Sequence, residues 1–198
     1  MRMLLLILLC ISLFLSSCFW GTSLLFLDSD SQGKLNLVPN SGLEKSDKSN
    51  PELPEGWLIV STLTDKSEPV TLDSTIVQSG KKSLKIANSK KDMYIVSDAF
   101  QVNYTGGYYS KFSIRSAKPM QKPARLYFWA YDNRGNKKNS FRKSIKARTD
   151  WKRASISAGF LKNSVSFARV AIFIPKDTDN TIYIDDVGCY LVHQFTKE

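Results

Sequence analysis

Short apolar runs alternate with turn-forming residues over most of this chain. From about Leu35 onward, Gly, Pro, Asn and Asp separate the runs, and no segment keeps a sustained helical period. The pattern predicts strands at Leu35–Val38, Trp57–Val60, Val70–Val77, Ser83–Ala87, Met93–Ser97, Gly107–Ser116, Ala124–Tyr131, Ser140–Lys146, Trp151–Ala158, Ser166–Ile174 and Thr181–Val192. About ten strands in roughly 160 residues are typical of a jelly roll. We therefore expect an all-β domain, a jelly-roll β-sandwich, over residues 35–198.

The N-terminus has the pattern of a secretory signal. Arg2 is a minimal basic region, Leu4–Leu15 is almost wholly apolar, and a Leu-Ser-Ser-Cys motif ends at Cys18. This motif resembles the bacterial lipobox, which implies that the chain is cut before Cys18 and that the Cys18 thiol is diacylated. We expect a lipoprotein signal peptide over residues 1–17, a lipidated tether over residues 18–34, and a covalent lipid on Cys18.

An uncut membrane anchor is the alternative. Met3–Leu27 is an uncharged stretch of 25 residues, and about 20 apolar residues suffice to span a bilayer. Small and polar residues interrupt the middle of this stretch, which favours the lipoprotein interpretation. In both interpretations the domain lies outside the cytoplasm. For the lipoprotein we expect a lipid-anchored position at the bacterial cell envelope, on the outer membrane.

Charge and residue counts narrow the classes of function. The chain has 28 Lys and Arg against 18 Asp and Glu, a formal charge of +10, and loss of Arg2 with the signal peptide leaves +9. A basic surface of this kind favours acidic partners. Three cysteines and one histidine, His193, exclude a disulfide-rich scaffold, a zinc cluster and any mechanism that needs two imidazoles. Cys189 lies in a strand-like run, where we expect a buried apolar residue.

Seven fragments follow one another in an order and spacing found in a known group. They are Asn40–Glu44, Pro54–Trp57, Ser79–Ile86, Tyr108–Ser116, Tyr131–Gly135, Thr149–Arg153 and Ile182–Val187. Together they resemble the carbohydrate-binding modules of families four, nine and twenty-two, within the galactose-binding-like β-sandwich group. The resemblance covers nearly the whole domain and implies its fold. It does not imply a ligand, because this fold carries many binding functions.

The resemblance also implies a structural calcium ion. Members of these families commonly hold one at positions that correspond to Glu44, the backbone at Lys81 and Lys82, and Asp185. Carboxylate and carbonyl oxygens suit this hard cation. The alternative is that Asp185 caps a turn or pairs with a lysine.

Strand alternation nominates a ligand-binding face. Arg125, Tyr127, Trp129 and Tyr131 lie opposite Leu126, Phe128 and Ala130, and Tyr109, Lys111 and Arg115 lie opposite Phe112 and Ile114. If the aliphatic sets form the core, the other sets form a face of Tyr, Trp, Arg and Lys. That composition suits stacking on sugar rings or contact with a protein. The alternative is that both faces are covered.

No arrangement of residues indicates catalysis. Asp185 and Asp186 are neighbours on a strand and should point to opposite faces, and His193 has no nucleophile motif beside it. We therefore expect a surface-anchored, non-catalytic binding lipoprotein whose ligand is a glycan, with no nucleic-acid partner. The alternative is a structural or protein-interaction lipoprotein that keeps the sandwich without binding sugar.

Overall fold

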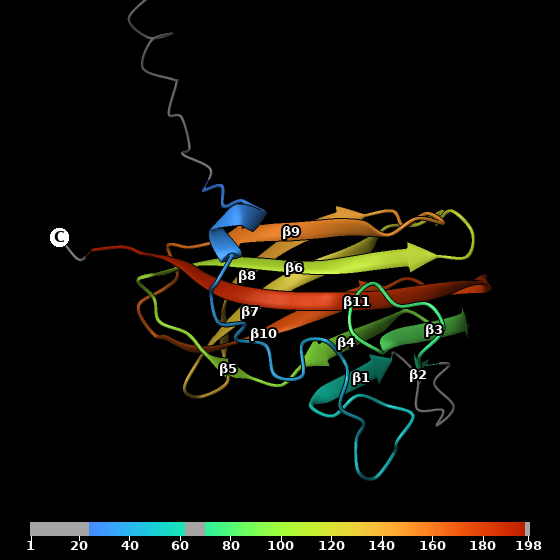
Figure 1. Ribbon diagram of the computed structural model, residues 1–198. Coiled ribbons are helices and arrows are strands. Elements are labelled where there is room, and N and C mark those ends of the chain that lie inside the picture. The colour runs from blue at the N-terminus through green and yellow to red at the C-terminus, as the bar shows by residue number, and fades with distance from the viewer. Residues whose placement is uncertain (1–23, 62–69, 197–198) are drawn as a thin grey trace, which may run out of the picture.

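Two antiparallel sheets form the domain in the computed structural model, which describes residues 24–61 and 70–196 (Figure 1). The first sheet has the order β1 (Trp57–Ser61), β4 (Met93–Ser97), β10 (Val165–Ile174), β7 (Ala124–Asp132), β8 (Lys137–Ile145), and β5 (Phe100–Gln101) also pairs with β10. The second has the order β2 (Val70–Asp73), β3 (Ser83–Ser89), β11 (Asp177–Gln194), β6 (Gly106–Ser116), β9 (Lys152–Ala158). The predicted all-β sandwich is confirmed. The predicted signal peptide and Cys18 lie outside the described residues.

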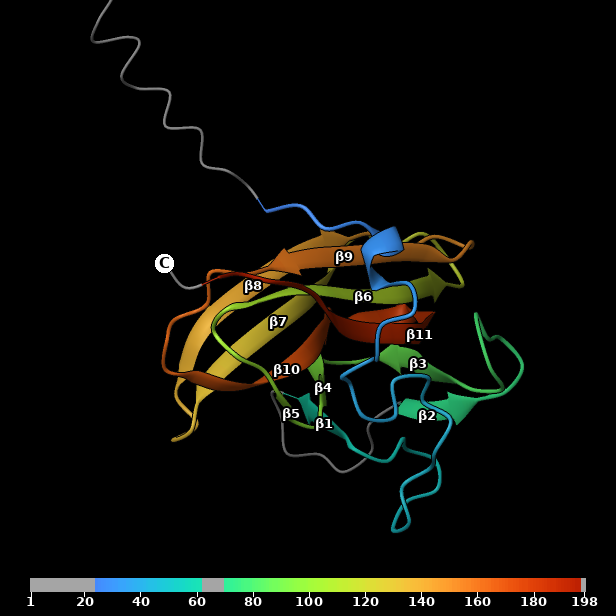
Figure 2. The same ribbon diagram turned by 60° about the vertical axis from the view of Figure 1, so that its left-hand side comes forward.

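Figure 2 shows the two sheets facing each other. The buried apolar side chains of both sheets form one core cluster. On β7 the alternation holds as predicted, with Leu126 and Phe128 fully buried and Trp129 on the outer side. Phe112 of β6 meets this layer from the second sheet and is also fully buried. Burying such side chains contributes about 1.5–3 kcal/mol each, so period-two alternation fixes which side of a strand faces inward.

Most predicted strands are present, with three differences. The strand predicted at Val70–Val77 ends at Asp73, because the Asp73 carboxylate accepts the backbone N–H groups of Thr75 and Ile76 and turns the chain there. Leu35–Val38 is not a strand, because only an isolated bridge from Asn36 to Tyr190 pairs it with β11. The short strand β5 was not predicted, since two residues carry no readable alternation. Strands β7 and β8 form a hairpin, and its turn uses Gly135 at φ +81°.

The segment before the sandwich packs against the second sheet. It contains the 3-10 turn η1 (Asp28–Ser31), and Phe26 donates its backbone N–H to Oγ of Ser157 on β9 at 2.6 Å. Residues 24–34, the described part of the expected tether over residues 18–34, therefore lie against the domain. No helix within residues 24–61 and 70–196 has the length and apolar character to cross a membrane.

Candidate functional site

The outer surface of the first sheet carries a layer of aromatic rings, which we call the aromatic face. Its members are Tyr94 on β4, Phe167 and Phe173 on β10, and Tyr127, Trp129 and Tyr131 on β7. Tyr94 is central: its ring centroid lies 5.1 Å from that of Phe173, 5.6 Å from Trp129 and 6.1 Å from Tyr127. Tyr127 and Trp129 lie 5.4 Å apart. These four rings, Tyr94, Tyr127, Trp129 and Phe173, form one continuous cluster.

A small residue allows rings from β4 and β7 to meet. These strands do not pair with each other, because β10 lies between them. Ala171 of β10 stands opposite Tyr127 on one side and opposite Val96 on the other, and it is fully buried. Because an alanine methyl leaves space above the strand, Tyr94 reaches over it to the rings of β7.

Tyr131 and Phe167 form a second group of rings on this face. Tyr131 and Phe167 are opposite each other in the pairing of β7 with β10, and their rings stack at 5.2 Å with an interplanar angle of 9°. Beyond Tyr94, β1 adds Leu58 and Val60, which are 59% and 44% exposed. The apolar surface therefore extends from β7 to the edge strand β1.

Four cations share this face with the rings. The Arg125 guanidinium lies 5.1 Å from the Phe173 ring centroid, and Nζ of Lys137 lies 4.7 Å from that of Trp129. Arg142 of β8 stands directly opposite Tyr127, and Arg169 stands opposite Trp129. The strand residues described on this face include no Asp or Glu. Its fixed charge is therefore positive.

The hydroxyls of Tyr94 and Tyr131 are neutral hydrogen-bonding groups on this face. Burial, together with the neighbouring Tyr127, raises the pKa of Tyr94 above its ordinary value of 10.0. Burial likewise raises the pKa of Tyr131, against the opposing charge of Arg169. Both phenols therefore keep their protons at physiological pH and can donate or accept hydrogen bonds.

The predicted ligand-binding residues divide between two surfaces. Arg125, Tyr127, Trp129 and Tyr131 lie together on the aromatic face, as alternation predicted. The prediction that Tyr109, Lys111 and Arg115 share one face with them is wrong, because β6 belongs to the second sheet and its outer side faces the other way.

Residues 24–31 account for the burial of two of those β6 residues. Tyr109 is 3% exposed, and Nζ of Lys111 lies 3.4 Å from Oδ1 of Asp28 and 3.6 Å from Oδ2 of Asp186. Arg153 of β9 contacts the same two carboxylates at 2.7 and 2.9 Å. These cations are paired and do not form an open binding surface.

Tyr94 is not among the ligand-binding residues predicted from the sequence, although the sequence carries a signal for it. Tyr94 alternates with Met93 and Ile95 along β4, and both of these are fully buried. The same period that nominated Trp129 places Tyr94 on an outer side. Tyr94 lies beside Trp129 because of the order of the strands in the sheet, and the alternation along a single strand does not predict that order.

Glu44 lies against the loop that precedes β3, as the calcium prediction requires. Its Oε1 accepts backbone N–H groups from Lys81 at 2.8 Å and Lys82 at 3.3 Å. Gly80, at φ +67°, is required here because a Cβ would collide with that oxygen. The loop thus presents N–H donors to Glu44, whereas calcium needs oxygen ligands.

Asp185 faces the same loop and is fully buried. Its Oδ2 accepts N–H groups from Gln78 at 2.8 Å and Ser79 at 2.9 Å, and its Oδ1 accepts that of Asp186 at 2.6 Å. Burial raises the pKa of Asp185 above 3.8, against the effect of these hydrogen bonds. Among the described residues no group of three or more His, Cys, Asp or Glu side chains could hold a metal ion. The N–H donors on both oxygens of Asp185 support the turn-capping alternative. Calcium binding stays a prediction of the resemblance.

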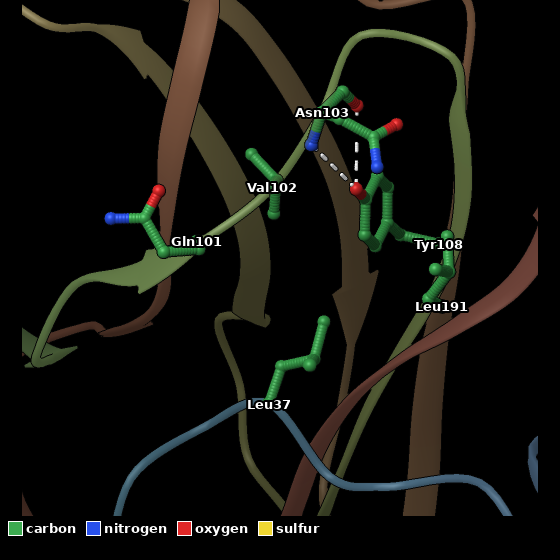
Figure 3. Close-up of a pocket in the computed structure, with 6 residues that line it drawn as sticks. All are labelled: Leu37, Gln101, Val102, Asn103, Tyr108 and Leu191. Carbon is green, nitrogen blue, oxygen red and sulfur yellow. Dashed lines mark hydrogen bonds between the residues drawn. The ribbon is translucent and has the colours of Figure 1, made fainter.

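A hollow of about 250 Å³ opens beside β5 (Figure 3). It is lined by Leu37, Gln101, Val102, Asn103, Tyr108 and Leu191. The Tyr108 hydroxyl accepts the backbone N–H of Asn103 at 2.8 Å and donates to its carbonyl at 3.3 Å. Because those polar atoms satisfy one another, the hollow offers an apolar wall and no activated group.

The described residues that could support catalysis do not converge. Asp185 points to the loop before β3, while Asp186 pairs with Lys111 and Arg153 on the outer surface. His193 lies near the C-terminal end, with its ring 4.7 Å from that of Phe195. Cys189 is fully buried, as predicted, and burial raises the pKa of its thiol.

Comparison with known proteins agrees with this geometry. No protein-family model matches the chain, and no curated protein matches its sequence. A solved family 61 carbohydrate-binding module in complex with β-1,4-galactotriose matches 79% of this chain and 99% of its own, with 13% identity and a TM-score of 0.55. This chain shares the β-sandwich fold of that module.

Other solved structures share the module fold. A family 16 carbohydrate-binding module matches 78% of this chain and 99% of its own, with 16% identity and a TM-score of 0.53. The enzymatically active domain of tailspike protein 4 from bacteriophage CBA120 has a TM-score of 0.61 and 15% identity, and matches 79% of this chain but 21% of its own. At these identities the similarity shows the module fold alone.

Proposed function

We propose that this chain is a surface-anchored, non-catalytic lipoprotein whose sandwich binds a glycan on the aromatic face. The observation that carries the proposal is the continuous cluster of Tyr94, Tyr127, Trp129 and Phe173 on the outer side of a sheet. Apolar faces of sugar rings stack on aromatic rings, and neutral phenols supply hydrogen bonds to sugar hydroxyls. The solved carbohydrate-binding modules of the same fold support this choice of ligand class.

The charge of the face favours an acidic glycan. Arg125, Lys137, Arg142 and Arg169 lie among the rings, and the described strand residues of the face provide no carboxylate to neutralise them. A guanidinium binds a carboxylate or a sulfate group through charge-assisted hydrogen bonds. We therefore propose a polysaccharide that bears uronate or sulfate groups.

The anchor part of the proposal comes from the sequence. The Leu-Ser-Ser-Cys motif that ends at Cys18 supports acylation and an envelope location. The divergence of Asp185 and Asp186 supports a non-catalytic role, because two carboxylates that share a substrate must face each other.

Protein interaction is the second candidate. Leu58 and Val60 are exposed at the β1 edge and continue the apolar surface of Val96, a composition also found at protein interfaces. In that case the rings would contact a protein, and no sugar would bind.

A glycan array separates the two candidates. We expect the mature chain in detergent to bind acidic glycans, and Trp129→Ala to weaken binding about 5- to 150-fold, equivalent to ~1–3 kcal/mol. Trp151→Ala is the matched control: Trp151 is partly exposed and lies just before β9, in the second sheet, so its loss should leave the affinity unchanged. A folded chain that binds nothing on the array, or a Trp129→Ala variant with unchanged affinity, would contradict the proposal.

A further inference from the structure

Several apolar side chains are exposed at one end of the sandwich. Figure 1 shows that the N-terminal segment, the loop between β9 and β10, and the C-terminus all lie at this end. Leu25 is 76% exposed, Leu27 57% and Phe160 67%. We call these three residues, with Leu24 and Phe195, the apolar end.

Three members of the apolar end, Leu24, Phe160 and Phe195, lie close together around Gly159. The rings of Phe160 and Phe195 stack at 4.8 Å with an interplanar angle of 24°. A Cβ at Gly159 would meet both Leu24 and Phe195, so these two side chains lie directly over that glycine. Lys162, two residues beyond Phe160 in the same loop, is exposed and adds a cation to this loop.

Phe160 is held in an unfavourable backbone conformation. Its φ is +51°, in the left-handed region that favours Gly and Asn and that bulky residues rarely adopt. The ring gains little burial in return, because two thirds of the residue is exposed. Residues held in such conformations cluster at functional sites, which makes Phe160 a candidate for a contact outside the chain.

The segment that leads to the apolar end is fixed to the domain. Phe26 is hydrogen-bonded to Ser157, and Asp28 pairs with Arg153 and Lys111. Position 24 is six residues beyond Cys18, so a fully extended chain places it at most about 20 Å from the acylated thiol. An uncut anchor over Met3–Leu27 would bring Leu24 still closer to the bilayer.

We infer that the apolar end rests in the headgroup region of the anchoring membrane, so that this end of the sandwich lies on the lipid surface. The inference depends on the anchor in the proposed function and is independent of the aromatic face. Leucine and phenylalanine side chains enter the interface, while Lys162 favours anionic headgroups. A second membrane attachment of this kind restricts how the domain is oriented on its short tether.

Single cysteines test this contact in the full acylated chain. In the mature protein Cys18 carries the lipid and Cys189 is fully buried, so an added thiol is the accessible one. We place an environment-sensitive fluorophore at Phe160→Cys or Leu25→Cys, with Gln121→Cys at the opposite end as the control. The protein is reconstituted in phosphatidylethanolamine and phosphatidylglycerol vesicles that contain spin-labelled lipids.

The expected result is strong quenching at positions 160 and 25 and none above background at position 121. Phe160→Asn should also reduce quenching at position 25. This variant should melt at or above the wild-type temperature, because asparagine tolerates a positive φ. Leu35→Asn, which removes another exposed leucine, should leave the quenching unchanged.

Two outcomes overturn the contact. One is equal quenching at all three positions in a chain whose acylation is confirmed by mass spectrometry. The other is a dimer in detergent that Phe160→Asn converts to a monomer, since this would assign the apolar end to a second copy of the chain. An unacylated mature N-terminus would instead show that the anchor has failed, and glycan binding remains a separate measurement.

Discussion

Replacing Asp185 by alanine removes the acceptor that holds the loop between β2 and β3. This carboxylate is fully buried and accepts backbone N–H groups from Gln78, Ser79 and Asp186 at 2.8, 2.9 and 2.6 Å. Hydrogen bonds to a charged acceptor contribute about 1.5–3 kcal/mol each. Without the carboxylate, all three donors lose their partner.

Two effects reduce the sum of these contributions. Gln78 and Ser79 are exposed residues, so water can recover part of the lost hydrogen bonding, and the burial of the Asp185 charge opposes folding. We expect Asp185→Ala to lower the free energy of unfolding by about 2–4 kcal/mol. For a domain of this size, this corresponds to a melting temperature lower by roughly 5–15 °C.

The neighbouring aspartate provides the control. Asp186 is partly exposed and forms ion pairs with Arg153 and Lys111 at 2.9 and 3.6 Å, which contribute about 0–1 kcal/mol. Its φ is +50°, which asparagine tolerates, so Asp186→Asn should lower the melting temperature only slightly.

Thermal melts of the three proteins, with and without a calcium chelator, measure the difference. We expect the chelator to leave the wild-type curve unchanged, since N–H donors already occupy both carboxylate oxygens of Asp185. Equal losses in the two variants would refute the hydrogen-bond reasoning. A chelator-dependent wild-type curve that Asp185→Ala abolishes would instead support the calcium site.

Three further predictions concern the anchor, acid stability and the charge of the ligand. Cys18→Ala should abolish acylation and prevent cleavage after residue 17, and an unmodified Cys18 in the wild-type mature protein, found by mass spectrometry, would contradict this. Although burial opposes the effect, hydrogen bonds from Asn136 and Lys138 hold the pKa of Asp132 well below its ordinary value of 3.8. The ionised Asp132 carboxylate should therefore stabilise the fold above pH 3.8, and this stabilisation should be lost as the pH falls below that value. When melting temperatures are measured over a range of pH, the decrease on acidification should be smaller for Asp132→Asn than for the wild type. Arg142→Gln should weaken binding of acidic glycans and reduce its salt dependence without lowering the melting temperature, whereas an equal loss for neutral glycans in titration calorimetry would exclude a charge effect.

Much of the local structure could be predicted from the sequence. The strands, the hairpin at Gly135 and the inner and outer sides of β7 follow from periodicity and turn chemistry, because successive side chains on a strand point to opposite faces. That rule placed Trp129 outside and Phe128 inside, and it separated Asp185 from Asp186. Leu35–Val38 shows its limit, because an apolar run forms a strand only where a partner strand lies beside it.

The composition of the candidate site was decided by the tertiary structure. Alternation assigns two sides to each strand but does not state which strands are neighbours, and pairing between distant segments determines that. Tyr109 and Trp129 have the same outward pattern, yet β6 and β7 lie in different sheets and point their outer sides away from each other. Tyr94 meets Trp129 because β10 lies between their strands and has the small residue Ala171 at the position between the two rings. The sequence by itself determined which residues face outward, and long-range strand pairing decided which of them meet.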